Sequence, residues 1–326
     1  MSLDDIKNTN KQKQAPAQPK LPELPVFHLS EAFASKPVPV DYVLPSLPRG
    51  KVGLLAAAGG TGKSFWTLQA SFQIVASGCC NFDLSGAEMD GGADKIGSVL
   101  LVSLEDEKDD LVRRLHSIKN HWIGFDDQYT WIEGTAEENL FQMLPLAGEG
   151  ISLFDDQCDA TPYVQAVEKH AKTMPNLRLI VVDTLRRSHD GDENNNGVMN
   201  KVLRTFEQLA KSLNASVLLI HHESKAAMGN ADAGAGALRG ASAIVDNARW
   251  VMRMQTMTKI EAESRGITSD DIRKQWVRVT NEKSNYGPIQ PEKWLKRVEN
   301  GVLVKAEPPA VADKKRGFGG GEYEAG

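Results

Sequence analysis

The sequence predicts an α/β fold with a twisted, mostly parallel sheet and helices on both faces. Short apolar runs of strand length alternate along the chain with segments whose apolar residues recur at helical spacing. A Gly-rich turn joins the first of these strands to the first of these helices, and acidic residues directly follow two later strands. At 326 residues the chain is long enough for one such domain with a well-buried core.

The first strand and the first helix flank the Gly-rich turn. Residues 52–56 form a continuous apolar run, and residues 64–76 carry apolar side chains three and four positions apart. The same two patterns continue along the chain. They predict further strands at 99–104, 129–132, 179–182, 216–220, 250–254, 276–280 and 302–304, and helices at 108–120, 162–172 and 197–213.

Both ends of the chain have the composition of disordered tails. Residues 1–25 are rich in Lys, Gln and Pro and poor in aromatic residues, so they cannot bury enough surface to order themselves. Residues 306–326 have the same character, with a basic cluster at Lys314, Lys315 and Arg316 that is either solvated charge or a contact for a phosphate backbone. The predicted core is therefore a single domain over residues 26–305.

The composition excludes several classes of protein. No apolar run reaches the roughly 18 residues that a membrane helix needs, so we expect a soluble, cytoplasmic protein without a membrane partner. The three cysteines lack metal-ligand spacing, and their odd number favours a reducing compartment. The net charge of -5 does not indicate an extensive nucleic-acid surface.

The Gly-rich turn carries the pattern of a phosphate-binding P-loop. Glycines in such a loop let backbone N–H groups point at the phosphates, a lysine neutralises the β- and γ-oxygens, and a hydroxyl binds Mg²⁺. The pattern departs only at its first position, where Ala57 replaces glycine. An ordinary Gly-rich turn before a helix is the alternative, but the position between strand and helix favours ATP and Mg²⁺ as cofactors. The predicted cradle comprises Ala57, Ala58, Gly59, Gly60, Thr61, Gly62, Lys63 and Ser64.

Two carboxylates complete the predicted site. Asp183 ends the most apolar strand, where a Walker B aspartate reaches the Mg²⁺ together with Ser64. Glu105 follows another strand and is the candidate base or orienting group for the attacking water. Glu105 and Asp106 would alternatively only begin an acidic helix N-terminus.

A pair of histidines ends the strand at 216–220. His221 and His222 reach the same edge of the sheet, where a polar side chain can sense the γ-phosphate. Metal ligation is the alternative, but the nearest other histidine, His189, and the surrounding residues lack ligand spacing. We therefore expect a sensor, with His222 preferred on the resemblance described next.

These pieces together resemble the RecA-type hexameric replicative helicases, and most closely the RepA-type helicases of broad-host-range plasmids. The resemblance spans nearly the whole core. It implies a RecA-like P-loop NTPase core that forms a six-membered ring, hydrolyses ATP between subunits, translocates on single-stranded DNA and meets a plasmid initiator or primase. It rests on the segments DYVLP at 41–45, AAGGTGKS at 57–64, LEDE at 104–107, VDTLRR at 182–187, HH at 221–222, RGAS at 239–242, DNARW at 246–250 and KSNYG at 283–287.

The resemblance also implies an arginine donated by the neighbouring subunit, which stabilises the charge on the transferring phosphoryl group. Arg249 matches that position, and Arg239 is a second candidate. Related helicases place a lysine and an arginine in a K-x-R-x-G-P pattern. Here the arginine is missing from that pattern, and Lys283 remains as a residue that could reach the nucleotide across the interface.

Two loops are expected to face the channel of such a ring, at 189–197 and 224–236. Lys225 is the clearest phosphate contact in them, and neither loop offers an aromatic stacking platform. Two other functions stay open: a RecA-like regulator that oligomerises with ATP without unwinding DNA, and a strand-exchange recombinase. The complete set of Lys63, Glu105, Asp183 and a partner arginine favours turnover, and with it the helicase.

Overall fold

The computed structural model describes residues 23–76, 96–123, 139–193, 195–223 and 243–311. The chain divides into two units, Met1–Val40 and Asp41–Gly326. The second unit holds all the strands of the described part of the chain. No helix in the described ranges is long and apolar enough to cross a membrane.

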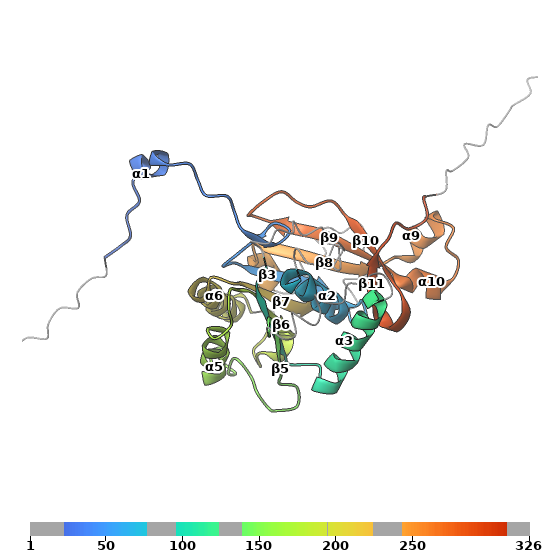
Figure 1. Ribbon diagram of the computed structural model, residues 1–326, viewed down its shortest axis with the longest axis horizontal. Coiled ribbons are helices and arrows are strands. Elements are labelled where there is room, and N and C mark those ends of the chain that lie inside the picture. Colours follow the sequence, from blue (N-terminus) through green and yellow to red (C-terminus); the bar gives the residue numbers. More distant parts are fainter. Residues whose placement is uncertain (1–22, 77–95, 124–138, 194, 224–242, 312–326) are drawn as a thin grey trace, which may run out of the picture. The chain divides into compact units, whose positions relative to one another are not determined.

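The second unit is built on one nine-stranded sheet with the order β11-β10-β9-β8-β3-β7-β6-β4-β5 (Figure 1). The strands β8, β3, β7, β6, β4 and β5 run parallel, whereas β9, β10 and β11 are antiparallel to their neighbours. The mostly parallel α/β fold predicted above is thereby confirmed. The strands are β3 (Val52–Ala57), β4 (Ser98–Ser103), β5 (Phe141–Pro145), β6 (Leu177–Asp183), β7 (Ser216–His222), β8 (Trp250–Thr256), β9 (Trp276–Ser284), β10 (Lys293–Arg297) and β11 (Leu303–Lys305).

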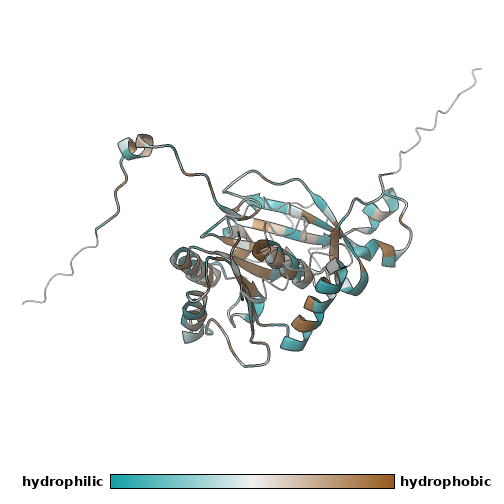
Figure 2. Ribbon diagram, viewed as in Figure 1, coloured by the Kyte–Doolittle hydropathy of each residue, from teal (hydrophilic) through white to brown (hydrophobic). Residues whose placement is uncertain are grey.

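Helices cover both faces of the sheet, because alternate residues of its buried strands point to opposite sides. On one face, Leu54 and Val182 pack with α5 (Pro162–Ala171), α6 (Asn196–Leu213) and α8 (Ala243–Asn247). On the other face, Leu55 and Val181 pack with α2 (Lys63–Val75) and α3 (Lys108–Ile123). Figure 2 shows the central strands and α2 as hydrophobic, which agrees with their burial in this three-layer core.

The structure adds elements that apolar periodicity does not indicate. β5 and β10 are half-buried and partly polar strands, and α9 (Lys259–Ser264) and α10 (Asp270–Gln275) are too short for a helical repeat. Two short 3-10 helices, η2 (Leu185–Arg187) and η5 (Glu299–Gly301), follow β6 and β10. The strand expected at 129–132 lies outside the described residues.

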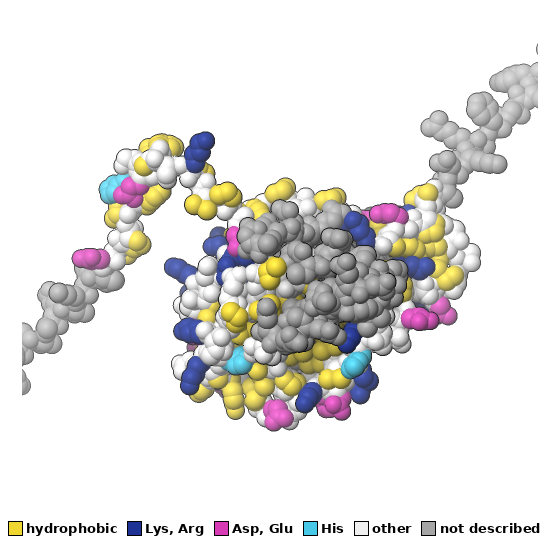
Figure 3. All heavy atoms as spheres, viewed as in Figure 1, with side chains coloured by type: hydrophobic (Ala, Val, Ile, Leu, Met, Phe, Trp, Pro, Cys, Tyr) yellow, Lys and Arg dark blue, Asp and Glu magenta, His cyan; other side chains and the backbone are white. Residues whose placement is uncertain are grey.

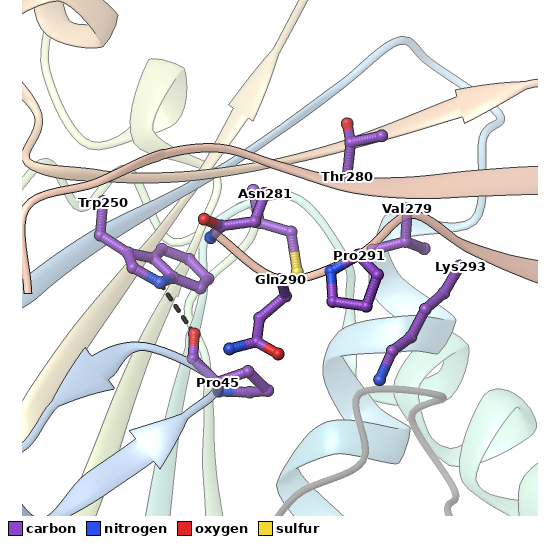
Figure 4. A pocket seen from close by; sticks show the side chains of 9 residues that line it. Pro45, Trp250, Val279, Thr280, Asn281, Gln290, Pro291 and Lys293 are labelled. Atoms are coloured by element: carbon purple, nitrogen blue, oxygen red, sulfur yellow. Dashed lines mark hydrogen bonds between the residues drawn. The ribbon is translucent and has the colours of Figure 1, made fainter. Parts of the chain in front are cut away.

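A two-stranded hairpin, β1 (Tyr42–Leu44) and β2 (Leu47–Pro48), leads into β3. Asp41 holds its start, because its carboxylate accepts hydrogen bonds from the buried guanidinium of Arg178 at 2.6 and 3.1 Å. The indole of Trp250 donates to the carbonyl of Pro45 at 3.0 Å, beside a small pocket walled by β8, β9 and residues 290–293 (Figure 4). The position of this hairpin therefore depends on contacts with β6 and β8.

Residues 23–40, the described part of the first unit, contain one short helix, α1 (Leu29–Ala34), which buries none of its residues. The expected core began at residue 26, but the compact second unit begins at Asp41. Large apolar side chains of the first unit are exposed, and Figure 3 shows them along the segment around α1. The most exposed of them are Leu24, Val26, Phe27, Leu29, Phe33 and Val38.

Candidate functional site

The Gly-rich turn lies between β3 and α2, at the carboxyl edge of the parallel strands. Gly60 and Gly62 have φ angles of 76° and 106°, which residues with a Cβ rarely adopt. A Cβ at Gly59 or Gly60 would meet no atom within 4 Å, so the loop faces open space. Ala57 is the last residue of β3 and has no positive φ, so its methyl group is compatible with the loop. The backbone of the turn and the start of α2 therefore form a cradle for an anion.

Lys63 is the first residue of α2 and is buried beneath this cradle. Its Nζ donates hydrogen bonds to the carbonyl oxygens of Ala57 and Ala58, both at 3.0 Å. Burial lowers the pKa of this ammonium group, although Asp183 and Glu105 partly oppose that shift. A desolvated ammonium held by two carbonyls is poised to exchange those partners for phosphate oxygens.

His222 connects Lys63 to Glu105. Its Nδ1 lies 3.1 Å from Nζ of Lys63 and its Nε2 lies 3.0 Å from Oε2 of Glu105. Because Lys63 can only donate, Nδ1 accepts the first bond and Nε2–H donates the second. The hydrogen bond from His222 is the main cause that lowers the pKa of Glu105, so this carboxyl stays ionised. Glu105 is thus an available base, held in position by the predicted sensor.

Asp183 ends β6 next to Ser64, whose hydroxyl donates to Oδ2 at 3.4 Å. Burial raises the pKa of Asp183 to about 6, and the charges of Asp106 and Glu105 add to this shift. A buried carboxylate next to a hydroxyl fits the oxygen ligands that Mg²⁺ prefers, and a bound cation would favour the ionised form.

The raised pKa has a measurable consequence for stability without nucleotide and magnesium. A carboxyl whose pKa is higher in the folded state contributes stability below its unfolded pKa, and that contribution is lost as pH rises through about 6. Asp183→Asn should therefore stabilise the fold at about pH 7.5 by up to ~3 kcal/mol, and much less at about pH 4.5. Thermal unfolding of the two proteins at both pH values measures this; an equal difference at both would contradict the assignment.

A cavity of about 310 Å³ joins these groups. Its size and its mixed cationic and anionic walls fit the triphosphate of a nucleotide with a divalent ion. The separate pocket of Figure 4 contains none of the predicted site residues. The described residues that line the cavity of about 310 Å³ are Gly60, Gly62, Lys63, Ser64, Phe65, Glu105, Asp106, Arg114, Asp183, His222, Arg297 and Gly301.

Asp106 and His221, which are next in sequence to Glu105 and His222, differ from them in their surroundings. Asp106 forms two hydrogen bonds with the guanidinium of Arg114, which leaves Glu105 as the better candidate to orient water. His221 is buried, and burial lowers its pKa to about 4, so it is neutral. Within the described ranges, no group of three His, Cys, Asp or Glu side chains is placed to hold a metal ion. The role of the histidine pair as a sensor stays a prediction.

Arg297 also belongs to the site, although no sequence motif marks it. Its Nη2 donates to the carbonyls of Gly60 and Thr61 in the loop, both at 2.8 Å. It comes from β10, and Leu303 of the following β11 exchanges two buried hydrogen bonds with Gln69 of α2. Hydrogen bonds thus join the antiparallel pair of β10 and β11 to the phosphate loop and to α2. No local signal could reveal Arg297, because 237 positions separate it from Gly60.

Arg297→Gln should weaken binding of a non-hydrolysable ATP analogue by roughly tenfold, because a bond to a charged donor contributes about 1.5 to 3 kcal/mol. Isothermal titration calorimetry measures the affinity. Lys296→Gln is the matched control, since adjacent strand residues face opposite ways and the Lys296 ammonium lies over the Trp276 ring. Equal affinities for the two variants would show that Arg297 does not support the loop.

Arg249 lies at the opposite edge of the sheet from the cradle. It precedes β8, in which Met254 pairs with Ala57, so five residues separate Arg249 from the level of the loop. That is about 16 Å of strand. The residue is exposed, and its carbonyl accepts a hydrogen bond from the backbone N–H of Asn285. Arg249 therefore does not reach the nucleotide site of its own subunit.

Lys283 lies at the same edge as Arg249, because it pairs with Val251 at the beginning of β8. Its predicted contact with nucleotide accordingly needs a second subunit. Arg239, Lys225 and the loop at 224–236 lie outside the described residues. The structure thus brings together Lys63, Ser64, Glu105, Asp183 and His222, and separates from them Arg249 and Lys283.

The nine-stranded sheet has a Gly-rich phosphate loop after β3 and an aspartate, Asp183, at the end of β6. These features define a RecA-like P-loop core. A family profile described as AAA domain matches residues 17–228, more than half of the chain, and the chain belongs to that family. A solved structure titled "The Structure Of A DnaB-Like Replicative Helicase And Its Interactions With Primase" has the same fold, with 17% identity and a TM-score of 0.52. The likeness covers 79% of this chain and 58% of that one, so this chain spans less than two thirds of its length.

Proposed function

We propose that this protein is an ATP-driven DNA translocase that acts as a homohexameric replicative helicase, with Mg²⁺ as the metal of its nucleotide. The observation that carries this proposal is the chain of contacts from Lys63 through His222 to Glu105 in one cavity with Asp183. A site that only binds nucleotide needs the lysine and the cradle, but it has no use for an ionised glutamate held toward the cavity.

The roles of the residues follow from this arrangement. Lys63 and the loop N–H groups bind the β- and γ-phosphates, and Ser64 and Asp183 hold the cation that neutralises the developing charge. Glu105 orients the attacking water and accepts its proton. When a γ-phosphate approaches, Lys63 exchanges its bonds to the two carbonyls and to His222 for phosphate oxygens, and His222 can then turn with the nucleotide state.

The remaining step requires a neighbouring subunit. In this proposal Arg249 stabilises the transferring phosphoryl group of the adjacent subunit's nucleotide, with Lys283 beside it. Their place at the edge opposite the cradle supports a head-to-tail arrangement, in which one edge of each subunit faces the other edge of the next. Heterologous contacts close into a ring when the rotation between subunits divides a full turn, and we propose six members.

The biological setting is the part of the proposal that depends on the resemblance to plasmid RepA-type helicases. In that setting the ring loads on single-stranded DNA at a plasmid origin and meets an initiator or a primase. The similar solved structure concerns a helicase and its interactions with primase, which supports testing a primase first.

The alternative is a RecA-like regulator that binds ATP and oligomerises without unwinding. The distinguishing experiment measures ATP hydrolysis with and without single-stranded DNA for the parent and for Glu105→Gln. We expect DNA to stimulate the parent and the variant to bind nucleotide but lose hydrolysis by at least about a hundredfold. A parent enzyme whose hydrolysis ignores DNA would favour the regulator.

A further inference from the structure

A second polar cavity lies at the carboxyl edge of the sheet, beyond the nucleotide site. Its volume is about 530 Å³, and it is lined by the segment after β5 and by the segment after β6. Both strands flank β4, whose end carries Glu105, so the cavity is next to the catalytic region. The carboxyl edge is where α/β sheets bind ligands. The lining residues are Gly150, Ile151, Ser152, Arg186, Arg187 and Asp190.

The charges of this cavity fit a singly charged anion. Among the described lining residues, two guanidinium groups and one carboxylate face it, which together carry one net positive charge. A phosphodiester carries one negative charge for each nucleotide, whereas free phosphate carries nearly two near neutral pH. The cavity is also larger than one phosphate group requires. Its size and the charge of its described lining therefore favour a phosphate within a strand.

Arg187 is available for such a contact. It is exposed, and its guanidinium forms no hydrogen bond or ion pair with any residue that the structure describes. Arg186 uses Nη1 to donate to the carbonyl of His189 at 3.2 Å, which fixes its direction beside the cavity. Arginine suits this task because its planar fork can donate two bonds to one phosphate.

The opposite wall lets a strand approach the backbone. Gly150, which lines this wall, has a φ angle of 65°, and a Cβ there would meet no atom within 4 Å. The hydroxyl of Ser152 donates to the carbonyl of Phe154 at 2.7 Å and is turned to the protein. Among the lining residues that the structure describes, none is aromatic, and the two arginines suit the phosphate groups of a strand rather than its bases.

We propose that Arg186 and Arg187 form a phosphate-binding subsite for single-stranded nucleic acid in this cavity. The inference rests on the proposed function, because that function supplies the strand. It assigns the contact to a cavity outside the loop at 224–236, and it makes the contact independent of base sequence. The subsite places the bound strand next to Glu105, close enough for Arg187 to contribute to the lowered pKa of that carboxyl after the larger effect of His222.

The test measures binding of fluorescein-labelled oligothymidylate to the full chain by fluorescence anisotropy, with a non-hydrolysable ATP analogue and a series of salt concentrations. Each lost contact should reduce the slope of log affinity against log salt by about 0.7, which is at least about fivefold in affinity near 0.1 M salt. Arg187→Gln should show this loss, and the double variant with Arg186→Gln a larger one. Arg204→Gln, on the exposed side of α6, is the matched control and should bind like the parent.

Asp190→Asn should change the affinity for the oligonucleotide in the opposite direction. A folding defect would not increase this affinity. Removing this carboxylate should strengthen binding by up to about fivefold at the same salt concentration. Arginine variants that bind DNA like the parent would overturn the subsite. So would a loss of ATP-analogue affinity as large as the loss of DNA affinity, because Arg187 would then act on the nucleotide. A parent protein that binds no oligothymidylate would instead contradict the proposed function.

Discussion

Arg249→Ala is expected to reduce ATP hydrolysis by about a thousandfold while nucleotide affinity and assembly stay close to those of the parent. The reason is geometric. Arg249 is exposed and lies about 16 Å along the sheet from the cradle of its own chain, so in the proposed ring it acts on the nucleotide of a neighbour. Steady-state hydrolysis, analogue binding and light scattering measure the three properties. Arg204→Ala is the control for loss of an exposed arginine.

A mixing experiment tests whether this arginine acts between subunits. Lys63→Ala subunits keep Arg249, and Arg249→Ala subunits keep Lys63. In a random equal mixture, about a quarter of the interfaces would join an intact cradle to an intact arginine. Hydrolysis should therefore reappear in the mixture of two inactive variants. A mixture that stays as inactive as its components would place the assisting arginine elsewhere.

Lys63→Ala is the second change with a large expected effect. It removes the ammonium that is held by Ala57, Ala58 and His222, so hydrolysis should fall by at least about a hundredfold and analogue affinity should fall with it. The fold should persist, because burial already disfavours this charge. Lys51→Ala, an exposed lysine just before β3, is the control. Normal hydrolysis in Lys63→Ala would contradict the assignment of the cradle.

The sequence predicts the fold and most of the nucleotide site because their signals are local. Buried parallel strands appear as continuous apolar runs, and their carboxyl ends meet at one edge, which brings Asp183, Glu105 and His222 to the cradle. That fold class is confirmed, and the roles of these residues stay predictions. The helix after the cradle begins at Lys63, one residue earlier than expected.

The remaining features depend on contacts between distant segments. Arg297 reaches the loop from a half-polar strand, and β5 lacks the apolar run of a central strand. The cavity of Arg186 and Arg187 forms only when the segments after β5 and β6 are placed side by side. The pattern of apolar residues within either segment does not indicate that the two segments lie side by side. The sequence alone therefore does not reveal this cavity.

Unwinding of a forked DNA duplex by the parent protein tests the central claim most directly. With ATP and Mg²⁺, the displaced strand should appear at a rate that follows hydrolysis, and Lys63→Ala and Arg249→Ala should release almost none. If the parent hydrolyses ATP and binds single-stranded DNA but leaves the fork intact, the protein is no helicase, and the nucleotide site described here serves a different process.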